Sequence, residues 1–429
     1  MTSPRNNSRF AALQYRDFRL LWFGRLLSAT GSQMQNIAIS WQVFELLQGE
    51  LFELILFGRT FTLGVSALGL GSLGLVRVIP IVIFALAGGI LADSRDRRSL
   101  LIVTQSASAF FALTLTILTF TGLITIPLIY LLSAATAAAS AFTNPAQQSL
   151  VPNLVPDKHL ANAVSLNSIL FQFGTIIGPG VAGFLIAQFD VGVVYLIDTI
   201  SFGAVILALL LMNYRGEAAM TTQGLGWDAL LEGVRYTFRT KIIWSSGLLD
   251  FFATFFGSAR TMLPIIATEI LNVGVEGFGI LATAQPVGAV IAGVFLAWRN
   301  EIKRQGVVLI TAVIIYGLAT AVFGIATIFA LSYFFFGLTG AADTVSAVIR
   351  GTLRQMLTPN ELRGRMTSVN MVFFMGGPQL GELEAGLVAA AFGAPFAIVT
   401  GGLATVVCTF LIAWRYPVLR NYQGDEPLD

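Results

Sequence analysis

"GGILADSRDRRSLL" occupies residues 88–101 and separates two long apolar runs. Five of the six residues at 93–98 are charged, and paired glycines precede them. A helix that crosses a membrane needs roughly 20 mostly apolar residues, and the runs on both sides meet that length. The charged stretch is therefore predicted to be a short loop at a membrane surface.

The composition of the whole chain agrees with a membrane protein. Of the 429 residues, 55% are apolar and 11% are charged, whereas soluble domains carry about 25% charged residues. The net charge of +2 gives no indication of nucleic-acid binding. We therefore expect an all-α integral membrane protein in contact with the lipid bilayer, with no nucleic-acid partner.

Twelve apolar segments are long enough to span a bilayer. The intervening stretch 47–71 is also apolar, but Glu50, Glu53 and Arg59 argue against a thirteenth span. It is predicted to extend the neighbouring helices outside the bilayer or to form a surface hairpin. The predicted spans are 20–46, 72–92, 99–121, 124–143, 163–187, 191–212, 244–267, 276–298, 306–325, 327–349, 366–391 and 395–416.

The basic residues indicate the orientation. With twelve spans, 21 of the 25 Lys and Arg residues fall before the first span, after the last, or in the even-numbered connections. The odd-numbered connections hold only Arg59. Because basic residues collect on the cytoplasmic side, both termini are predicted to be cytoplasmic, in a plasma (inner) membrane.

An internal repeat divides the chain. A shift of 203 residues aligns 150–183 with 353–386, and pairs such as Asn167/Asn370 and Gly178/Gly381 are identical. The predicted organisation is two pseudo-symmetric six-helix halves at 1–212 and 244–429, joined by a cytoplasmic linker at 213–243 with an amphipathic helix.

This arrangement resembles the major facilitator superfamily along the whole chain, and the resemblance is strongest in the loop quoted first. Gly89, Asp93, Arg97 and Arg98 match the superfamily signature, while Ser94 replaces a basic residue and Asp96 replaces a glycine. The aspartate resembles the enterobactin exporter, or transmembrane secretion effector, branch. The resemblance implies alternating access by two rocking halves. We expect the loop to act as a gate latch; the alternative is a topology anchor and turn.

A second motif, "GTIIGPGVAG" at 174–183, resembles the glycine–proline signature of major facilitator exporters. Gly174 and Gly178 share a helix face that permits close packing, Pro179 bends the helix, and Gly183 follows. The resemblance favours export. The alternative is a packing face without directional meaning.

Charged residues within the spans are costly and therefore informative. Glu382, Glu384 and Asp250 are candidates for proton coupling. The two glutamates are about 200° apart on a helix, so they face one cavity only if the helix is broken. The alternative is that they pair with Arg25 or Arg77.

Two further intramembrane acids are given local roles. Asp198 is expected to have a local partner near the outer third of its span. Asp343 and Arg350 are seven residues apart, which places them on one helix face as a pair.

Polar residues at membrane depth are candidates for the cavity lining. They include Gln33, Asn36, Arg25 and Arg77. The chain has 34 Phe residues, and "YFFFGL" at 333–338 presents aromatic faces. An aromatic cavity suits a bulky, amphiphilic small molecule.

Together these features predict a secondary active exporter of a bulky siderophore-like or drug-like solute by proton antiport. No nucleotide-binding sequence or nucleophile–base pair is recognised, so an enzyme is not expected, and no cofactor is predicted. The single His159 cannot build a multi-histidine metal site. We expect a monomer. The alternatives are a lipid or lysolipid flippase of the same fold and a non-transporting membrane sensor.

Overall fold

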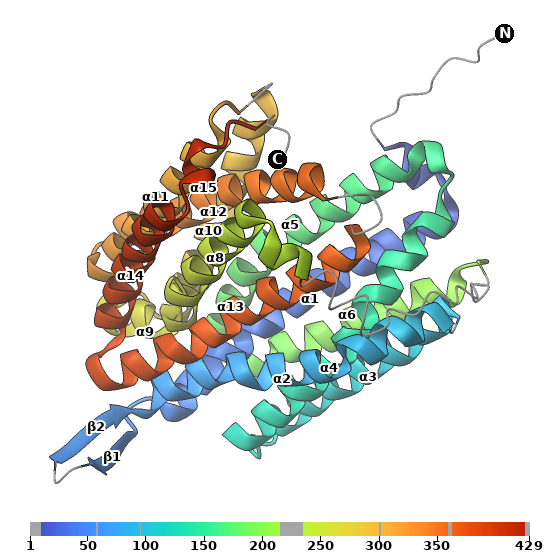
Figure 1. Cartoon of the computed structure of the whole chain (residues 1–429). Helices are drawn as coiled ribbons and strands as arrows, with labels where there is room; N and C mark the ends of the chain where they lie inside the picture. The colour runs from blue at the N-terminus through green and yellow to red at the C-terminus, as the bar shows by residue number, and fades with distance from the viewer. Residues whose placement is uncertain are drawn as a thin grey trace. The chain divides into compact units, whose positions relative to one another are not determined.

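The computed structural model describes residues 10–56, 59–94, 96–214, 235–299, 302–358 and 363–424 (Figure 1). Side chains at 54–61, 85–95 and 363–376 lie outside this description. Nearly all of the described chain is helical, which confirms the predicted all-α class.

Twelve long helical segments run through the described residues, one for each predicted span. Each begins and ends within about ten residues of the predicted position, which reflects how strongly continuous apolar runs mark membrane helices. They are α1 (Arg16–Leu47), α2 (Val65–Ser94), α3 (Arg97–Phe120), α4 (Ile126–Leu150), α5 (Asp157–Gln188), α6 (Val191–Leu211), α8 (Lys241–Phe256) with its continuation to Ile270, α10 (Gly274–Trp298), α11 (Gln305–Ile325), α12 (Phe329–Leu357), α13 (Arg363–Phe392) and α14 (Ala394–Arg415).

Ten of these segments are both long and apolar enough to cross a membrane when only the described residues are considered. The other two, α1 and α13, contain 32 and 30 residues, which is also sufficient length. The first of them has several charged residues near its ends, and these lower its hydropathy.

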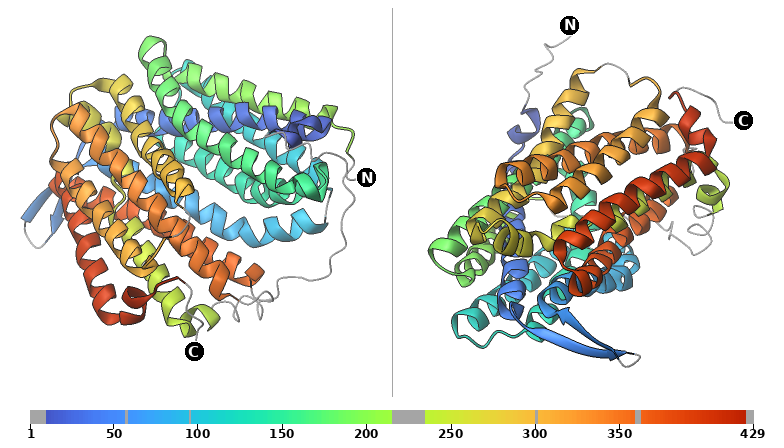
Figure 2. Two further views of the ribbon diagram at one scale, coloured as in Figure 1. Left: turned by 90° about the horizontal axis from the view of Figure 1, so that it is seen from above. Right: turned by 90° about the vertical axis from the view of Figure 1, so that its left-hand side faces the viewer.

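The stretch 47–71 forms a β-hairpin followed by the first turns of α2. Strands β1 (Leu51–Leu56) and β2 (Arg59–Gly64) pair antiparallel, with Leu51 opposite Gly64. The hairpin is visible as the pair of arrows in Figure 2. Of the two predictions for this stretch, the hairpin is confirmed, and α2 also extends seven residues beyond its predicted start at 72.

The seventh span is not the continuous helix predicted at 244–267. After α8 ends at Phe256, the chain passes through a 3₁₀ turn (η3, Ala259–Met262), the short α9 (Leu263–Ile265) and a π-helical turn (η4, Ile266–Ile270). The Tyr316 hydroxyl donates to the Gly257 carbonyl at 2.9 Å and gives that carbonyl a partner outside its own helix. A side chain at Gly257 would collide with the Tyr316 ring, so the break depends on glycine.

The chain divides into two compact units. Unit 1 comprises Met1–Ile39 and Ile79–Gly224, and unit 2 comprises Ser40–Val78 and Leu225–Asp429. The halves at 1–212 and 244–429 come from the sequence repeat, and their boundaries stay a prediction. Most of the linker residues predicted to form an amphipathic helix, 215–234, lie outside the described residues.

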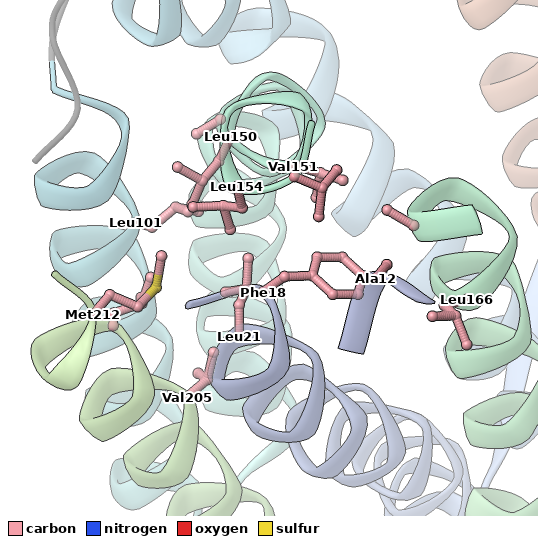
Figure 3. Packing of buried hydrophobic residues seen from close by; sticks show 14 of the residues in the cluster. Ala12, Phe18, Leu21, Leu101, Leu150, Val151, Leu154, Leu166, Val205 and Met212 are labelled. Carbon is pink, nitrogen blue, oxygen red and sulfur yellow. The ribbon is translucent and has the colours of Figure 1, made fainter. Parts of the chain in front are cut away.

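Unit 1 has a hydrophobic core at one end of its helices. Phe18 of α1 is 1% exposed and lies at the centre of the cluster beside Ala12 (Figure 3). Leu101, Leu154 and Val205 bring α3, the turn after α4, and α6 into the same cluster. These contacts fix the first turns of α1 against three other helices.

Unit 2 has a core of its own. Residues of α8, α11, α12 and α14 meet there, and α15 (Pro417–Asn421) closes it with Leu419. Tyr236 precedes α8 and donates its hydroxyl hydrogen to the Leu357 carbonyl at 2.6 Å. The last turn of α12 is thereby tied to the segment that leads into α8.

Candidate functional site

The first half of α2 packs against α13 with almost no side chain between the two backbones. Both stretches are rich in small residues, which permits such close approach. A Cβ built on Gly71 would lie 2.7 Å from the Cα of Gly386, and one built on Gly386 would lie 2.6 Å from the Cα of Gly71. We call this contact, at Gly71, Gly74, Gly386 and Glu382, the α2–α13 seam. It lies wholly within unit 2.

Glu382 stands in this seam. A Cβ built on Gly74 would lie 2.9 Å from Oε2 of Glu382, so the carboxylate rests against α2 one helical turn before Arg77. The charge of Glu382 interacts with both Arg77 and Arg260. Two arginines and one glutamate from three separate elements therefore form a cluster of opposite charges at membrane depth, which we call the Glu382 cluster.

The break in the seventh span supplies Arg260 to this cluster. The residue lies in η3, immediately after α8 ends, and it keeps an exposed surface. The Ser258 hydroxyl donates to the Thr254 carbonyl at 2.8 Å and also lies 3.3 Å from the Pro378 carbonyl, which places the break against α13. In other transporter folds, interrupted helices place their helix ends and free backbone groups at the substrate site. Arg260 falls within the predicted span 244–267, but its place beside Glu382 was not predicted.

Glu384 does not share the position of Glu382. Helix α13 continues without a break from Arg363 to Phe392, so the two residues lie about 200° apart around it. Glu384 is partly buried. Both acids were expected to face one cavity only if the helix were broken. Because α13 is continuous, that condition is not met.

Asp250, the third predicted proton-coupling residue, forms a buried ion pair. Nη2 of Arg350 lies 2.7 Å from Oδ1 of Asp250 and 3.7 Å from Oδ1 of Asp343. Nη1 of Arg350 donates to the Ser346 hydroxyl at 2.6 Å. The predicted Asp343–Arg350 pair is present, but the tighter partner is Asp250 on α8. Sequence could not show this, because the two helices are far apart in the chain.

The predicted cavity residues of unit 1 lie on α1. Nη1 of Arg25 donates to Oδ1 of Asn167 on α5 at 3.2 Å. Gln33 is partly buried, and Asn36 is exposed. An exposed amide at membrane depth is expected to face water rather than lipid. Arg25 thus has a partner inside its own unit, whereas Arg77 is the residue beside Glu382.

The glycines of the α5 motif face α1. A Cβ on Gly174 would lie 3.3 Å from the backbone of Ala29, and one on Gly178 would lie 2.7 Å from the Cβ of Gln33. Pro179 and Gly183 are buried in the same helix. The motif packs α5 closely on α1, while its predicted link to the direction of transport stays a prediction.

The charged loop between α2 and α3 has a clear structural role in its described part. Asp96 caps α3 by accepting from the backbone nitrogens of Arg98, at 3.2 Å, and Ser99, at 3.1 Å. Nε of Arg98 donates to the Leu209 carbonyl at 2.7 Å, and Nη2 donates to the Leu210 carbonyl at 3.0 Å. These carbonyls end α6, so Arg98 satisfies groups that a helix terminus leaves open. Asp96 stands where the superfamily signature has a glycine, and in that position it serves as the N-cap of α3.

The structure describes fewer contacts for the other residues of the predicted latch. Gly89 and Asp93 lie in α2, but side chains at 85–95 are outside the described residues. Arg97 begins α3 and is partly buried. The hydrogen bonds that Arg98 makes to Leu209, Leu210 and Tyr214 lie within unit 1, and the latch itself stays a prediction.

Aromatic side chains gather along α8. The rings of Phe251 and Phe255 are stacked with centroids 5.7 Å apart, and Phe252 stacks on Phe256 at 6.2 Å. In "YFFFGL", Phe336 is buried, whereas Phe334 is 62% exposed. Successive aromatic residues on α12 therefore divide between the core and the surface. Within the described ranges, no group of His, Cys, Asp and Glu residues is placed to hold a metal ion.

The sequence profile of the transmembrane secretion effector family, a branch of the major facilitator superfamily, matches residues 7–425. The chain belongs to this family. It is therefore a multi-pass membrane transporter by descent, as the sequence resemblance predicted.

Two relatives of this chain are transporters named for siderophores. The enterobactin exporter of Salmonella typhimurium is 21% identical over 411 residues, which cover 96% of this chain and 95% of the exporter. The staphyloferrin A transporter of Staphylococcus aureus is 26% identical over 264 residues. That match covers 61% of this chain and 64% of the transporter, so it spans less than two thirds of the relative's length.

Solved structures show that the chain has the major facilitator fold. A D-xylose–proton symporter superposes with a TM-score of 0.71 at 13% identity, covering 94% of this chain and 98% of the symporter. An inward-facing bacterial homologue of the human lysosomal transporter Spinster gives 0.69 at 15% identity, with 94% and 97% coverage. At these identities the likeness concerns the fold alone.

Proposed function

We propose that this protein is a secondary active exporter of a bulky, anionic, siderophore-like solute, driven by proton antiport. The observation that supports export most directly is the relation to the enterobactin exporter along almost the full length of both chains. The chemistry of the Glu382 cluster supplies a mechanism, and we develop it from the charges that meet at the α2–α13 seam.

Glu382 is proposed as the proton carrier. While the carboxylate is ionised, it attracts Arg77 and Arg260 and holds the seam together. When it is protonated, two positive charges remain without their shared counter-ion, and mutual repulsion favours separation of α2 from α13. The protonation state of one residue thus biases the seam between a closed and an open form.

Cargo competes for the same arginines in this proposal. Arg260 keeps an exposed surface, and Phe251 and Phe255 lie on the helix that precedes it. A solute with carboxylate or catecholate groups and aromatic rings could pair with the arginine and stack on the phenylalanines. Glu382, displaced from the arginines, would take up a proton after the site has opened to the outside, where the cargo leaves. Glu382 would then carry the proton inward and release it to the cytoplasm as it pairs with the arginines again, so cargo and proton move in opposite directions.

The remaining parts of the proposal concern conformational change and placement. The halves at 1–212 and 244–429 would rock about the cargo site, with Gly89 and Asp93 in the latch and Gly178 and Pro179 at the α1–α5 contact. The transporter would act as a monomer in the plasma (inner) membrane, with both termini cytoplasmic. Asp250 is assigned to the structural pair with Arg350 rather than to proton transfer.

Transport by the purified protein in proteoliposomes tests this function. Efflux is followed for a catecholate siderophore, a carboxylate siderophore, a cationic dye and a lysolipid, each with and without an imposed pH gradient. We expect gradient-driven movement of an anionic siderophore. Lysolipid movement that ignores the gradient would identify a flippase instead. A protein that moves none of the four, although correctly folded, would favour the non-transporting sensor.

A further inference from the structure

Asp198 is an acidic side chain that the proposed transport cycle does not use, and it is fully enclosed in unit 1. It lies on α6 with 0% of its surface exposed. Oδ1 of Asp198 lies 3.1 Å from the hydroxyl of Ser201 on the same helix and 3.5 Å from that of Ser32 on α1. Oδ2 is buried and makes no hydrogen bond in the structure.

Within the described ranges, no basic group forms an ion pair with the carboxyl group of Asp198. Its hydrogen-bond neighbours there are the hydroxyl groups of Ser201 and Ser32. An ionised carboxylate without a counter-ion in an apolar interior costs several kcal/mol or more. The enclosure therefore fits the neutral acid.

Other titratable groups on the surrounding helices are too far away or already engaged. On α1 the nearest basic residue is Arg25, seven positions or about 10 Å along the helix from Ser32, and it bonds to Asn167 on α5. Arg98 of α3 binds the far end of α6. On α6 itself the neighbouring titratable group is Tyr195, which is neutral at physiological pH and fully buried.

The hydrogen-bond geometry at Ser201 also favours the neutral acid. The Ser201 hydroxyl oxygen lies 2.7 Å from the carbonyl oxygen of Asp198 and 3.1 Å from Oδ1 of the same residue. A hydroxyl has one hydrogen and can donate to only one of these acceptors. When the Ser201 hydroxyl donates its hydrogen to the nearer acceptor, the backbone carbonyl of Asp198, it has none left for Oδ1. The 3.1 Å contact between the hydroxyl oxygen and Oδ1 is then a hydrogen bond only if Oδ1 carries a proton and donates it.

We propose that Asp198, Ser201 and Ser32 form a proton-binding site that α1 seals. In the proposed site, Oδ1 of Asp198 carries the proton and donates it to the Ser201 hydroxyl. The site lies in unit 1, apart from the Glu382 cluster of unit 2. It can therefore hold a proton whether or not Glu382 is the carrier.

Gly31 explains how α1 seals the site. A Cβ built on Gly31 would lie 2.6 Å from Oδ1 of Asp198 and would also collide with Ser201. The absence of a side chain lets the α1 backbone close directly over the acid. On another face, α1 is held by Gly174 and Gly178 of α5. Water reaches Asp198 only when α1 moves away from α6, so proton exchange reports that movement.

Infrared spectroscopy of the purified full-length protein tests the proposal. A protonated carboxylic acid has a carbonyl stretching band separate from that of a carboxylate. At neutral pH we expect one such band in the wild type that is lost in Asp198→Asn, whose amide is isosteric with the neutral acid. The matched control, Asp343→Asn, removes a half-exposed acid and leaves the band in place. A wild-type spectrum without a band sensitive to Asp198→Asn overturns the proposal.

A second variant keeps the test decisive if Asp198→Asn does not fold. Ser201→Ala removes the acceptor of the acid's hydrogen bond, so the carbonyl band should shift in frequency while the protein keeps its carboxyl group. No shift would contradict the assigned donor and acceptor.

In deuterium oxide, the wild-type band should exchange slowly, and Gly31→Ala should accelerate exchange by forcing α1 from α6. Immediate exchange in the wild type would contradict the seal.

Discussion

Glu382 of α13 rests its carboxylate against Gly74 of α2, one helical turn before Arg77. The contact unites two features that are separated by about 300 residues of sequence. One is a glycine face that lets two helices touch, and the other is a partly buried acid whose charge acts on two arginines. Closing of the seam and ionisation of Glu382 are therefore expected to be linked.

A small substitution in the seam should disturb transport strongly. In Gly71→Ala the new methyl group meets the backbone of Gly386 at 2.7 Å, so the helices must separate. Overpacking of this kind costs about 1–3 kcal/mol and should shift the protein toward the open seam. Efflux rate and the chemical accessibility of a cysteine placed at Gln379 measure the shift. The matched control is Gly293→Ala, where a Cβ meets nothing within 4 Å. Equal effects of the two substitutions would refute a special role for the seam.

Arg98→Ala should reduce stability rather than cargo affinity. The substitution removes the hydrogen bonds from a charged group to the last carbonyls of α6, each worth about 1.5–3 kcal/mol before solvent exposure reduces it. Thermal unfolding in detergent should show a lower midpoint for Arg98→Ala than for Arg97→Ala. If unfolding is unchanged but turnover falls, Arg98 serves the latch rather than the end of α6.

The two acids around Arg350 should differ in their effect on stability. Asp250→Asn leaves the buried guanidinium without its 2.7 Å partner, and breaking a buried pair costs about 3–5 kcal/mol. Asp343→Asn removes a half-exposed acid at 3.7 Å and should cost much less. Unfolding of both variants, and of Asp250→Asn combined with Arg350→Gln, measures the pair. A double variant no more stable than Asp250→Asn would contradict the account.

Gly178→Ala tests the α5 motif. The added methyl group lies 2.7 Å from the Cβ of Gln33, so α1 must move relative to α5. We expect slower transport in both directions, because the contact serves helix packing. Gly203→Ala on α6, where a Cβ meets nothing within 4 Å, is the control. Selective loss of efflux with normal uptake would instead give the motif directional meaning.

The sequence was sufficient to predict the fold because each membrane-spanning helix is a long apolar segment. Continuous apolar runs and the sorting of basic residues gave twelve helices and a hairpin region before any contact was known. The same signals could not show the break after Phe256. A continuous apolar run is predicted to be helical whether or not a side chain from another helix bonds to one of its carbonyls. Here the Tyr316 hydroxyl of α11 donates to the Gly257 carbonyl.

The candidate site was predictable in its residue types but not in its partners. Intramembrane charges singled out Glu382, Arg77, Asp250 and Asp198, because each is expensive in a bilayer. Their pairings depend on which helices touch. Asp250 proved to be the tighter partner of Arg350 through a contact between α8 and α12, which no periodicity within either helix reveals.

Coupled measurement of proton and cargo movement tests the central claim most directly. Proteoliposomes contain a pH-sensitive dye and receive an anionic siderophore under an imposed pH gradient. We predict opposite movement of protons and siderophore in the wild type, its loss in Glu382→Gln, and its retention in Glu384→Gln. Gradient-driven transport that survives unchanged in Glu382→Gln would contradict the account.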